Sequence, residues 1–318
     1  MNSSTNHTNS SFIPTAADCR VWKEEYHQEN YVSTLAAIIL NMVTCPLTVF
    51  VNLLVIIAVK TKQRLQTSYN IVLACLAATD LVVGAIVQPS FIVGETFLIT
   101  GATLMEYCVH YNRSIFLFVA PCLASLHLLA LLSIERYLAM KYPLRYQEII
   151  TKFRLTIAVI SCWVAAVIPS IIVNSAKLSY QDYQALAIPY VLVFSSLVVI
   201  IYCHISVYFV TRRHMYQIKT EQVSQDAQKK FLEGKKAAVT TTIIIGFVLF
   251  SFLPSIVFKF VGSLPADDYV GNLFISFKPI FLSCFMVNSL CNPVIYCWRS
   301  SVLRRALCEV LRRTSNAG

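Results

Sequence analysis

A glutamate and an arginine stand side by side at the end of a long apolar run, in the stretch 133–137, Ser-Ile-Glu-Arg-Tyr. A basic segment that includes Lys141 and Arg145 follows. A charged side chain at the edge of a membrane-buried helix is costly unless it is paired, and such residues mark function by default. Glu135 can hold Arg136 through a charge-assisted contact. The two residues form either a functional switch or an ordinary pair whose charged ends reach the membrane surface.

A carboxylate, Asp80, stands in the middle of another apolar run. An isolated carboxylate in such a place needs polar partners. The candidate partners lie in three other apolar runs and are Asn52, Ser125, Asn288, Ser289 and Asn292. Asn288 and Asn292 are four residues apart and share one helix face. These groups either build a functional site around Asp80 or only join helices to one another.

The run that ends at Arg136 presents one face to the rest of the molecule. At about 100° per residue, Phe118, Ser125 and Arg136 lie within roughly 20° of one another around a helix. We expect this face to look into a bundle and to carry an outer pocket wall, a mid-membrane polar residue and the inner Arg.

The elements that position these residues are membrane helices. Of the 318 residues, 57% are hydrophobic and 13% are charged, whereas soluble proteins average about 25% charged residues. A helix needs about 20 apolar residues to cross a bilayer, and lipid requires that its backbone hydrogen bonds be satisfied internally. Seven segments qualify: 31–59, 68–94, 106–140, 153–174, 184–211, 236–261 and 270–297. The predicted fold is an all-α membrane protein, a seven-transmembrane helix bundle.

The positive charges orient this bundle. Most of the 26 Lys and Arg residues fall after the first, third and fifth predicted spans and in the C-terminal tail, and loops rich in these residues face the cytoplasm. We therefore expect a multi-pass plasma-membrane protein with an extracellular N-terminus, membrane lipids as partners and no nucleic acid. Three sequons, at Asn2, Asn6 and Asn9, predict glycosylation of the outer tail. The predicted divisions are this tail (1–30), the bundle (31–299) and a cytoplasmic segment (300–318).

The cytoplasmic segment predicts a short amphipathic helix on the inner leaflet. Its apolar residues recur at helical spacing with arginines between them: Val302, Leu303, Leu307, Val310 and Leu311. Ser300 or Ser301 can cap the helix. Cys308 is either a palmitoylation site or a plain buried thiol.

The eleven cysteines have no spacing typical of a zinc site. Only Cys19 and Cys108 fall on the predicted outer side, where the compartment is oxidising. They form either a disulfide or two free thiols.

Taken together and in order, these motifs resemble those of class A, rhodopsin-like G protein-coupled receptors. Besides the seven spans they are Asn52, Leu-Ala-x-x-Asp around Asp80, Glu135-Arg136-Tyr137, Trp163, Tyr202, Phe252-Leu253-Pro254 and Asn292-Pro293-x-x-Tyr296. The resemblance covers about residues 31–312. It implies a receptor with a small-molecule, lipid or peptide ligand outside and a heterotrimeric G protein inside.

The resemblance also implies the residues of the switch that couples to the G protein. They are Glu135, Arg136, Tyr137, Tyr202, Asn292, Pro293 and Tyr296. The family's acid in the sixth span is not matched in register, because Gly234 stands at its usual place and Glu233 is one residue off. With Glu135 as its one partner, Arg136 should be weakly restrained, and we expect measurable basal signalling.

The polar cluster predicts a sodium ion in the inactive state, and no other cofactor is expected. Hard cations prefer oxygen ligands. Asp80 and Ser125 would bind the ion, and Asn288 and Asn292 would support it directly or through water. The alternative is a hydrogen-bond network without sodium.

Several positions depart from the family pattern. Tyr111 stands where the outer Cys is usual, Phe194 replaces a Pro of the fifth span, and Phe252 replaces a Trp of the sixth. The short second outer loop, about 175–183, has no Cys. These losses are similar to the melanocortin, lysophospholipid and cannabinoid receptors, which we expect to be the nearest branch.

The outer third of the bundle predicts the chemistry of the ligand. Aminergic receptors carry an Asp where this chain has Phe118, so monoamines are not expected to activate it. Three cations, Arg113, Lys259 and Lys278, instead suit a carboxylate or phosphate. The predicted apolar walls are Phe118, Cys122, Phe252, Ile256, Phe281 and Phe285. A small acidic, partly apolar ligand such as a lipid acid fits this lining, unless the cations only reach for the outer membrane surface.

Three other functions are disfavoured. An opsin-like photoreceptor would carry its retinal-binding Lys where this chain has Met286. A transporter or channel would show paired broken helices or rings of charge. An enzyme is not expected, because there is no nucleophile–base pair, metal spacing or phosphate loop.

Overall fold

The computed structural model describes residues 31–175, 183–220 and 268–315, together with positions 232, 239, 242, 243 and 246. Its long helices are α2 (Tyr31–Thr61), α3 (Ser68–Val82), α4 (Gln88–Thr100), α5 (Leu104–Lys141), α7 (Lys152–Ser175), α8 (Tyr183–Thr220), α10 (Asp268–Arg299) and α11 (Ser301–Ser315). Within these ranges six helical segments are long and apolar enough to cross a membrane, with α3 and α4 forming one of them. Six predicted spans are therefore confirmed. Most of the sixth, 236–261, lies outside the described residues, as do the N-terminal tail with its sequons and Cys19.

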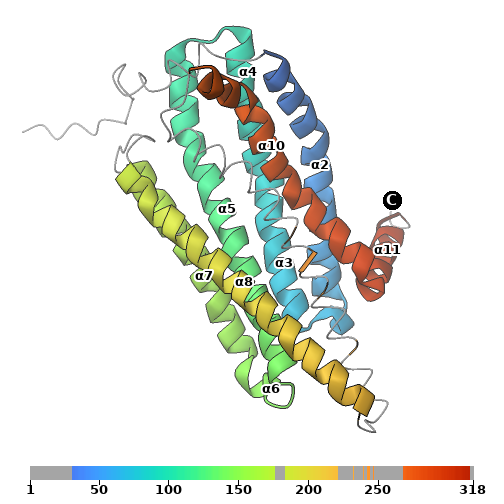
Figure 1. The fold of residues 1–318 in the computed structure, drawn as a ribbon. Helices are drawn as coiled ribbons and strands as arrows, with labels where there is room; N and C mark the ends of the chain where they lie inside the picture. The colour runs from blue at the N-terminus through green and yellow to red at the C-terminus, as the bar shows by residue number, and fades with distance from the viewer. Residues whose placement is uncertain are drawn as a thin grey trace, which may run out of the picture.

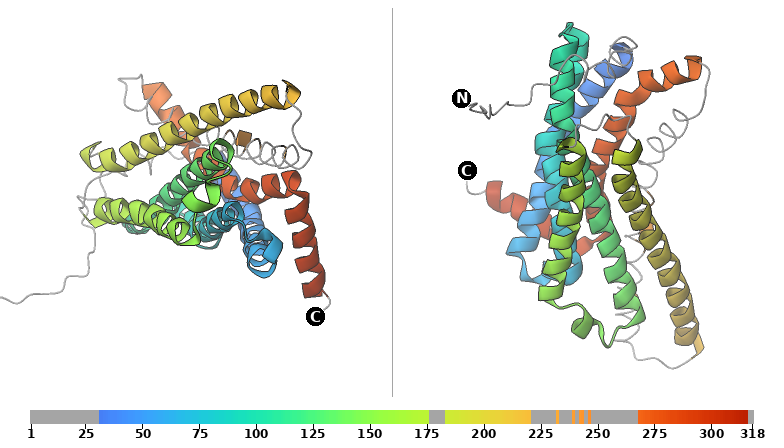
Figure 2. Two further views of the ribbon diagram at one scale, coloured as in Figure 1. Left: turned by 90° about the horizontal axis from the view of Figure 1, so that it is seen from below. Right: turned by 90° about the vertical axis from the view of Figure 1, so that its left-hand side faces the viewer.

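The helices form an elongated bundle around α5 (Figure 1). α5 packs against α3, α7 and α8, while α10 lies along α2. The chain changes direction at the end of α10, so that α11 runs at an angle to α10 and packs against α2 (Figure 2). The predicted all-α architecture is thus confirmed, and the amphipathic segment after the last span is helical as expected.

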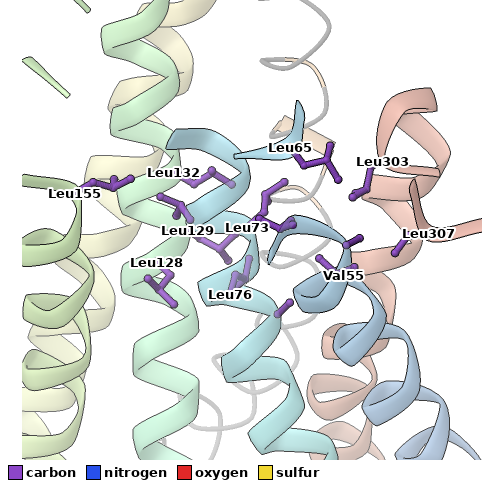
Figure 3. Packing of buried hydrophobic residues seen from close by; sticks show 14 of the residues in the cluster. Val55, Leu65, Leu73, Leu76, Leu128, Leu129, Leu132, Leu155, Leu303 and Leu307 are labelled. Atoms are coloured by element: carbon purple, nitrogen blue, oxygen red, sulfur yellow. The ribbon is translucent and has the colours of Figure 1, made fainter. Parts of the chain in front are cut away.

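The largest cluster of buried hydrophobic residues in the described part of the chain lies in the half of the bundle that contains α11 (Figure 3). Leu76 of α3 and Leu128 and Leu132 of α5 are fully buried there. Leu155 of α7 and Leu303 of α11 complete the same cluster. Lipid is as apolar as leucine, so close packing rather than removal from water holds such helices together. Large apolar side chains elsewhere on α2, α7 and α8 point outward, as expected of surfaces that face lipid.

The second span is interrupted by a turn of π-helix, η3 (Val83–Val87), which the sequence analysis did not predict. Pro89 follows in the first turn of α4. A proline cannot donate a backbone hydrogen bond, and its ring collides with the preceding helical turn. The turn before Pro89 therefore changes from α-helical to π-helical winding.

The span then ends in a tight connection to α5. Gly101 has a φ of 75°, the left-handed conformation that glycine adopts most easily. Thr103 and Glu106 form a capping box at the start of α5: the Glu106 N–H donates to Thr103 Oγ1 (3.3 Å) and the Thr103 N–H to Glu106 Oε2 (2.8 Å).

Candidate functional site

The predicted pair Glu135–Arg136 is present at the α11 end of the bundle. Arg136 Nε and Nη2 donate to Glu135 Oε2 and Oε1, both at 2.5 Å. Glu135 is fully buried, and the Arg136 side chain is 13% exposed. A two-pronged contact between a guanidinium and a carboxylate is among the strongest hydrogen-bonded arrangements in proteins. The charge of Arg136 is therefore neutralised and held close to its own helix.

Two tyrosines strengthen this pair, and the prediction that Glu135 is the sole restraint is wrong. The guanidinium carbon of Arg136 lies 4.1 Å from the ring centroid of Tyr69, near the start of α3. The Tyr146 hydroxyl donates to Glu135 Oε1. Tyr146 begins a one-turn helix, α6 (Tyr146–Ile149), which the sequence did not predict. Neither contact could be predicted from the sequence. Tyr69 and Tyr146 both lie beside loops, and their positions depend on the conformation of those loops.

The phenol of Tyr146 remains a donor at physiological pH. Burial, and then the negative charge of Glu135, raise the pKa of Tyr146 to about 12. Because this pKa lies far above neutrality, the hydroxyl keeps its proton and continues to stabilise the carboxylate.

Tyr137 and Tyr202 face each other beside this pair. Their ring centroids are 6.2 Å apart in an edge-to-face arrangement between α5 and α8. Tyr202 is 61% exposed, and Lys141 Nζ donates to the Tyr137 hydroxyl at 2.5 Å. The predicted switch residues on α5 and α8 are thus neighbours, while the side chain of Tyr296 lies outside the described residues.

Asp80 meets its predicted partners from α10. Asn292 Nδ2 donates to Asp80 Oδ2 at 2.9 Å, and Ser289 also forms a hydrogen bond with the carboxylate. Asn52, another candidate partner, instead donates to the carbonyl oxygen of Ser289 at 3.0 Å. Asn52 thus fixes α10 against α2, and Ser289 connects it to Asp80. Pro293, predicted as part of the switch, is buried in α10 next to Asn292.

A small cavity of ≈ 10 Å³ lies beside Asp80. Its polar lining is Asp80, Ser125, Asn288, Ser289 and Asn292, which brings the four predicted sodium-site residues together. The space suffices for about one water-sized particle. Asn288 Oδ1 and Asn292 Oδ1 are buried and have no hydrogen-bond partner among the described residues. The cavity is therefore lined by residues that provide oxygen atoms with unused capacity to accept.

The predicted ligand pocket is only partly brought together. The rings of Phe118 and Phe285 lie 5.6 Å apart, and Cys122 and Phe285 also line the cavity beside Asp80. Phe281 and Lys278 are partly buried in α10. Phe252, Ile256, Lys259 and the side chain of Arg113 lie outside the described residues. Phe118, Cys122 and Phe285 are thus neighbours, and the ligand pocket, with its grouping of the three cations, stays a prediction.

A second buried polar network, which the sequence analysis missed, joins α2, α4 and α10. Gln88 is fully buried, and its Nε2 donates to Asn41 Oδ1 (3.0 Å) and Thr44 Oγ1 (2.9 Å). Asn41 Nδ2 donates in turn to Ser283 Oγ at 2.7 Å. The signal was available, because Asn41 and Gln88 are amides within otherwise apolar spans.

α11 carries the predicted cap and amphipathic pattern. The Leu303 N–H donates to Ser300 Oγ at 3.2 Å. The buried residues of α11 form one apolar stripe: Leu303, Ala306, Leu307 and Val310. Lys62, in the loop between α2 and α3, pairs with Glu309 of α11. The free thiol of Cys308 is exposed rather than buried, so the plain buried thiol is excluded and palmitoylation stays a prediction. The pairing of Cys19 with Cys108 lies outside the described residues.

Comparison with known proteins agrees with this geometry. The sequence model of the family described as 7 transmembrane receptor (rhodopsin family) matches residues 51–296. The match begins in α2 and ends at Tyr296 in α10, so it includes Asp80, the Glu135–Arg136 pair and Asn292. It does not distinguish among branches of the family, and the predicted branch stays a prediction.

Proposed function

Because the chain belongs to the rhodopsin family of seven-transmembrane receptors, we propose that it binds a ligand from outside the cell and activates a heterotrimeric G protein through its inner end. The inner end is then the one that carries Arg136, α6 and α11. Exposed basic residues at that end, including Lys60, Arg64 and Lys152, support this orientation, because positively charged loops stay in the cytoplasm.

The observation that carries this proposal is the way Arg136 is held. Glu135 and the Tyr69 ring hold its guanidinium at the inner rim of the bundle. Neither contact is covalent, and the Arg136 side chain keeps 13% of its surface exposed, so a docking partner can offer it other contacts in exchange. A guanidinium presents five donors in a fixed plane, which suits recognition of backbone carbonyls or carboxylates on a partner.

The second inner loop supplies an anchoring side chain for the same partner. Leu144 is 96% exposed and is followed by the basic residue Arg145. An apolar side chain displayed in this way gains free energy by entering a pocket on another protein. Because α6 begins two residues after Leu144 and contacts Glu135 through Tyr146, binding at the loop would change the contacts that hold Arg136.

The ligand we propose is acidic and partly apolar, and it is not a monoamine. Phe118 offers no charge to an amine, and it forms an apolar wall with Phe285. Replacing Arg113, Lys259 and Lys278 singly with Gln should lower agonist potency about tenfold for each cation that contacts the ligand, equivalent to roughly 1.4 kcal/mol. Potency unchanged in all three variants would contradict an acidic ligand. An agonist for this assay is sought in a second-messenger screen of peptide, lipid and amine libraries.

We also propose that the cavity beside Asp80 holds a sodium ion in the inactive state. The residues fit such an ion: a buried carboxylate, the Ser125 hydroxyl and the unpaired amide oxygens of Asn288 and Asn292 are the hard oxygen ligands that it prefers. The ion would supply a positive charge that offsets Asp80. Asn52 and Ser289 would keep the α10 oxygens in position through their own hydrogen bonds.

A further inference from the structure

An open hollow of ≈ 420 Å³ lies beside α6, where the chain passes from α5 to α7 (Figure 1). Its lining consists of Tyr142, Arg145, Glu148, Ile149 and Arg154. Sites that bind small molecules commonly have volumes of about 300–1,000 Å³. A guanidinium recognises phosphate groups through paired hydrogen bonds. The hollow, with its two arginines, therefore has the size and the charge to take a phosphorylated group larger than a single phosphate ion.

One of the two arginines, Arg154 of α7, is held in place by the end of α6. Its Nη1 donates to the carbonyl oxygens of Glu148 (3.0 Å) and Ile149 (3.2 Å). Its backbone N–H donates to Thr151 Oγ1 at 3.3 Å, at the start of α7. The two carbonyl contacts use two of the five N–H groups of the guanidinium, and no acceptor among the described residues meets the other three. Arg154 is thus a positioned cation with donors to spare for a ligand.

The other arginine, Arg145, directly precedes α6 and is only loosely paired. Its Nε lies 3.9 Å from Glu148 Oε2, and the two side chains are 79% and 75% exposed. Ion pairs as exposed as this one are weak, so a phosphate group can replace the carboxylate as the partner of Arg145. Glu148 is then free to accept hydrogen bonds from hydroxyl groups on the same ligand.

An apolar stripe on α7 places the hollow at the membrane surface. The segment of α7 from Lys152 to Ile172 is long and apolar enough to cross a membrane. Its large exposed side chains recur along one helix face: Phe153, Ile157, Ile160, Val164 and Ile168. Leu155, on the opposite face, is buried in the main cluster. The acyl chains of a lipid that cover this stripe end near Phe153, and its headgroup then lies at the level of Arg154.

We propose that this hollow binds the headgroup of a phosphorylated phosphoinositide, a lipid whose acyl chains lie along the stripe on α7. Arg145 and Arg154 bind its phosphate groups, and Glu148 accepts from hydroxyl groups of the inositol ring. The stripe is the reason to assign a lipid rather than a soluble phosphate compound. Anionic lipids lie in the cytoplasmic leaflet, so their supply to this site rests on the proposed orientation. The binding itself is a property of the isolated receptor and needs no G protein.

The test measures which lipids the full-length receptor retains. Purified receptor is mixed with phosphatidylinositol bisphosphate, phosphatidylserine and phosphatidylcholine that have the same acyl chains, and the bound lipids are counted by native mass spectrometry. One basic residue near an anionic headgroup changes affinity about fivefold. We therefore expect the bisphosphate lipid to be retained about fivefold or more over phosphatidylserine. Arg145→Gln, which leaves the contacts of Arg154 with α6 intact, should lower this retention about fivefold.

A double variant and its matched control locate the binding. Arg145→Gln/Arg154→Gln should lower retention of the bisphosphate lipid by more than about tenfold. Arg304→Gln/Arg305→Gln removes the same charge from exposed positions of α11 and should change retention less than about twofold. Equal losses in the two double variants would overturn the site, because a general attraction to basic surface would then be the cause. Full retention by Arg145→Gln and by its double variant, with melting temperatures that show both folded, would also overturn it.

Soluble inositol trisphosphate, added as a competitor, distinguishes a lipid from a free phosphate compound. At a concentration equal to that of the lipid it should leave the bisphosphate lipid bound, because it lacks the acyl chains that cover the stripe. If it displaces the lipid at that concentration, the hollow is a site for a soluble phosphate compound and the assignment to a lipid is wrong.

Discussion

At the scale of single residues, the end of the bundle that we propose to bind the G protein is organised around one buried carboxylate. Glu135 is fully buried, and a buried charge is tolerated only when its oxygens are hydrogen-bonded. Arg136 satisfies both oxygens, and Tyr146 adds a third hydrogen bond. The strength with which Arg136 is retained therefore depends on a loop residue as well as on its neighbour in sequence.

Removing the hydroxyl of Tyr146 should loosen the switch. Tyr146→Phe keeps the ring and removes a hydrogen bond to a charged group, worth about 1.5 kcal/mol or more. We expect the population with a released Arg136, and with it basal signalling, to rise about tenfold. The measurement is ligand-independent second-messenger production at matched surface expression. Tyr142→Phe, an exposed tyrosine of the same loop, should have no effect, and an equal rise in both variants would count against a specific role for Tyr146.

The cavity beside Asp80 can be tested without any agonist. An ion that binds only the folded receptor stabilises it by about 1.4 kcal/mol at ten times its dissociation constant. The melting temperature of the purified receptor should therefore be higher by a few degrees in sodium chloride than in potassium or choline chloride of equal ionic strength. Asp80→Asn should abolish this difference. If the three salts give the same melting temperature for the unmutated receptor, the cavity holds only water.

At the scale of elements, α11 is held by packing rather than by charge. Leu303 and Leu307 are buried in the cluster shared with Val55 and Val59 of α2. The Lys62–Glu309 pair crosses the same junction, but the Glu309 side chain is 59% exposed. Exposed pairs contribute about 0–1 kcal/mol, whereas removing a buried leucine side chain costs about 2–5 kcal/mol.

Substitutions at this junction should separate the two contributions. Leu303→Ala should lower the melting temperature by several degrees and reduce surface expression. Lys62→Gln should change the melting temperature by no more than about one or two degrees. Thermal melts of the two purified variants check this expectation, and the reverse order of effects would show that the ion pair, not the apolar stripe, positions α11.

At the scale of the whole molecule, the spans could be predicted because apolar length alone identifies them. The grouping of Asp80 with Asn292 and Ser125 could be predicted because an isolated carboxylate in an apolar span needs polar partners, and the Glu135–Arg136 pair followed from adjacency. The contacts of Tyr69 with Arg136 and of Tyr146 with Glu135 could not be predicted, since the positions of both tyrosines depend on the conformation of the loops beside them. The π-helical turn at Val83–Val87 was not predicted either, although Pro89 indicates that the helix is perturbed near this point.

The central claim is that the inner end activates a G protein through Arg136. The direct measurement is nucleotide exchange on purified heterotrimeric G proteins by the receptor in nanodiscs, with and without Arg136→Ala. Because this change leaves the buried carboxylate of Glu135 unpaired, Glu135→Gln/Arg136→Ala is measured beside it as a variant without that charge. We expect exchange above the receptor-free background for the unmutated chain on at least one G protein, and none for either variant at equal amounts of folded receptor. Full exchange by both Arg136 variants would contradict the account.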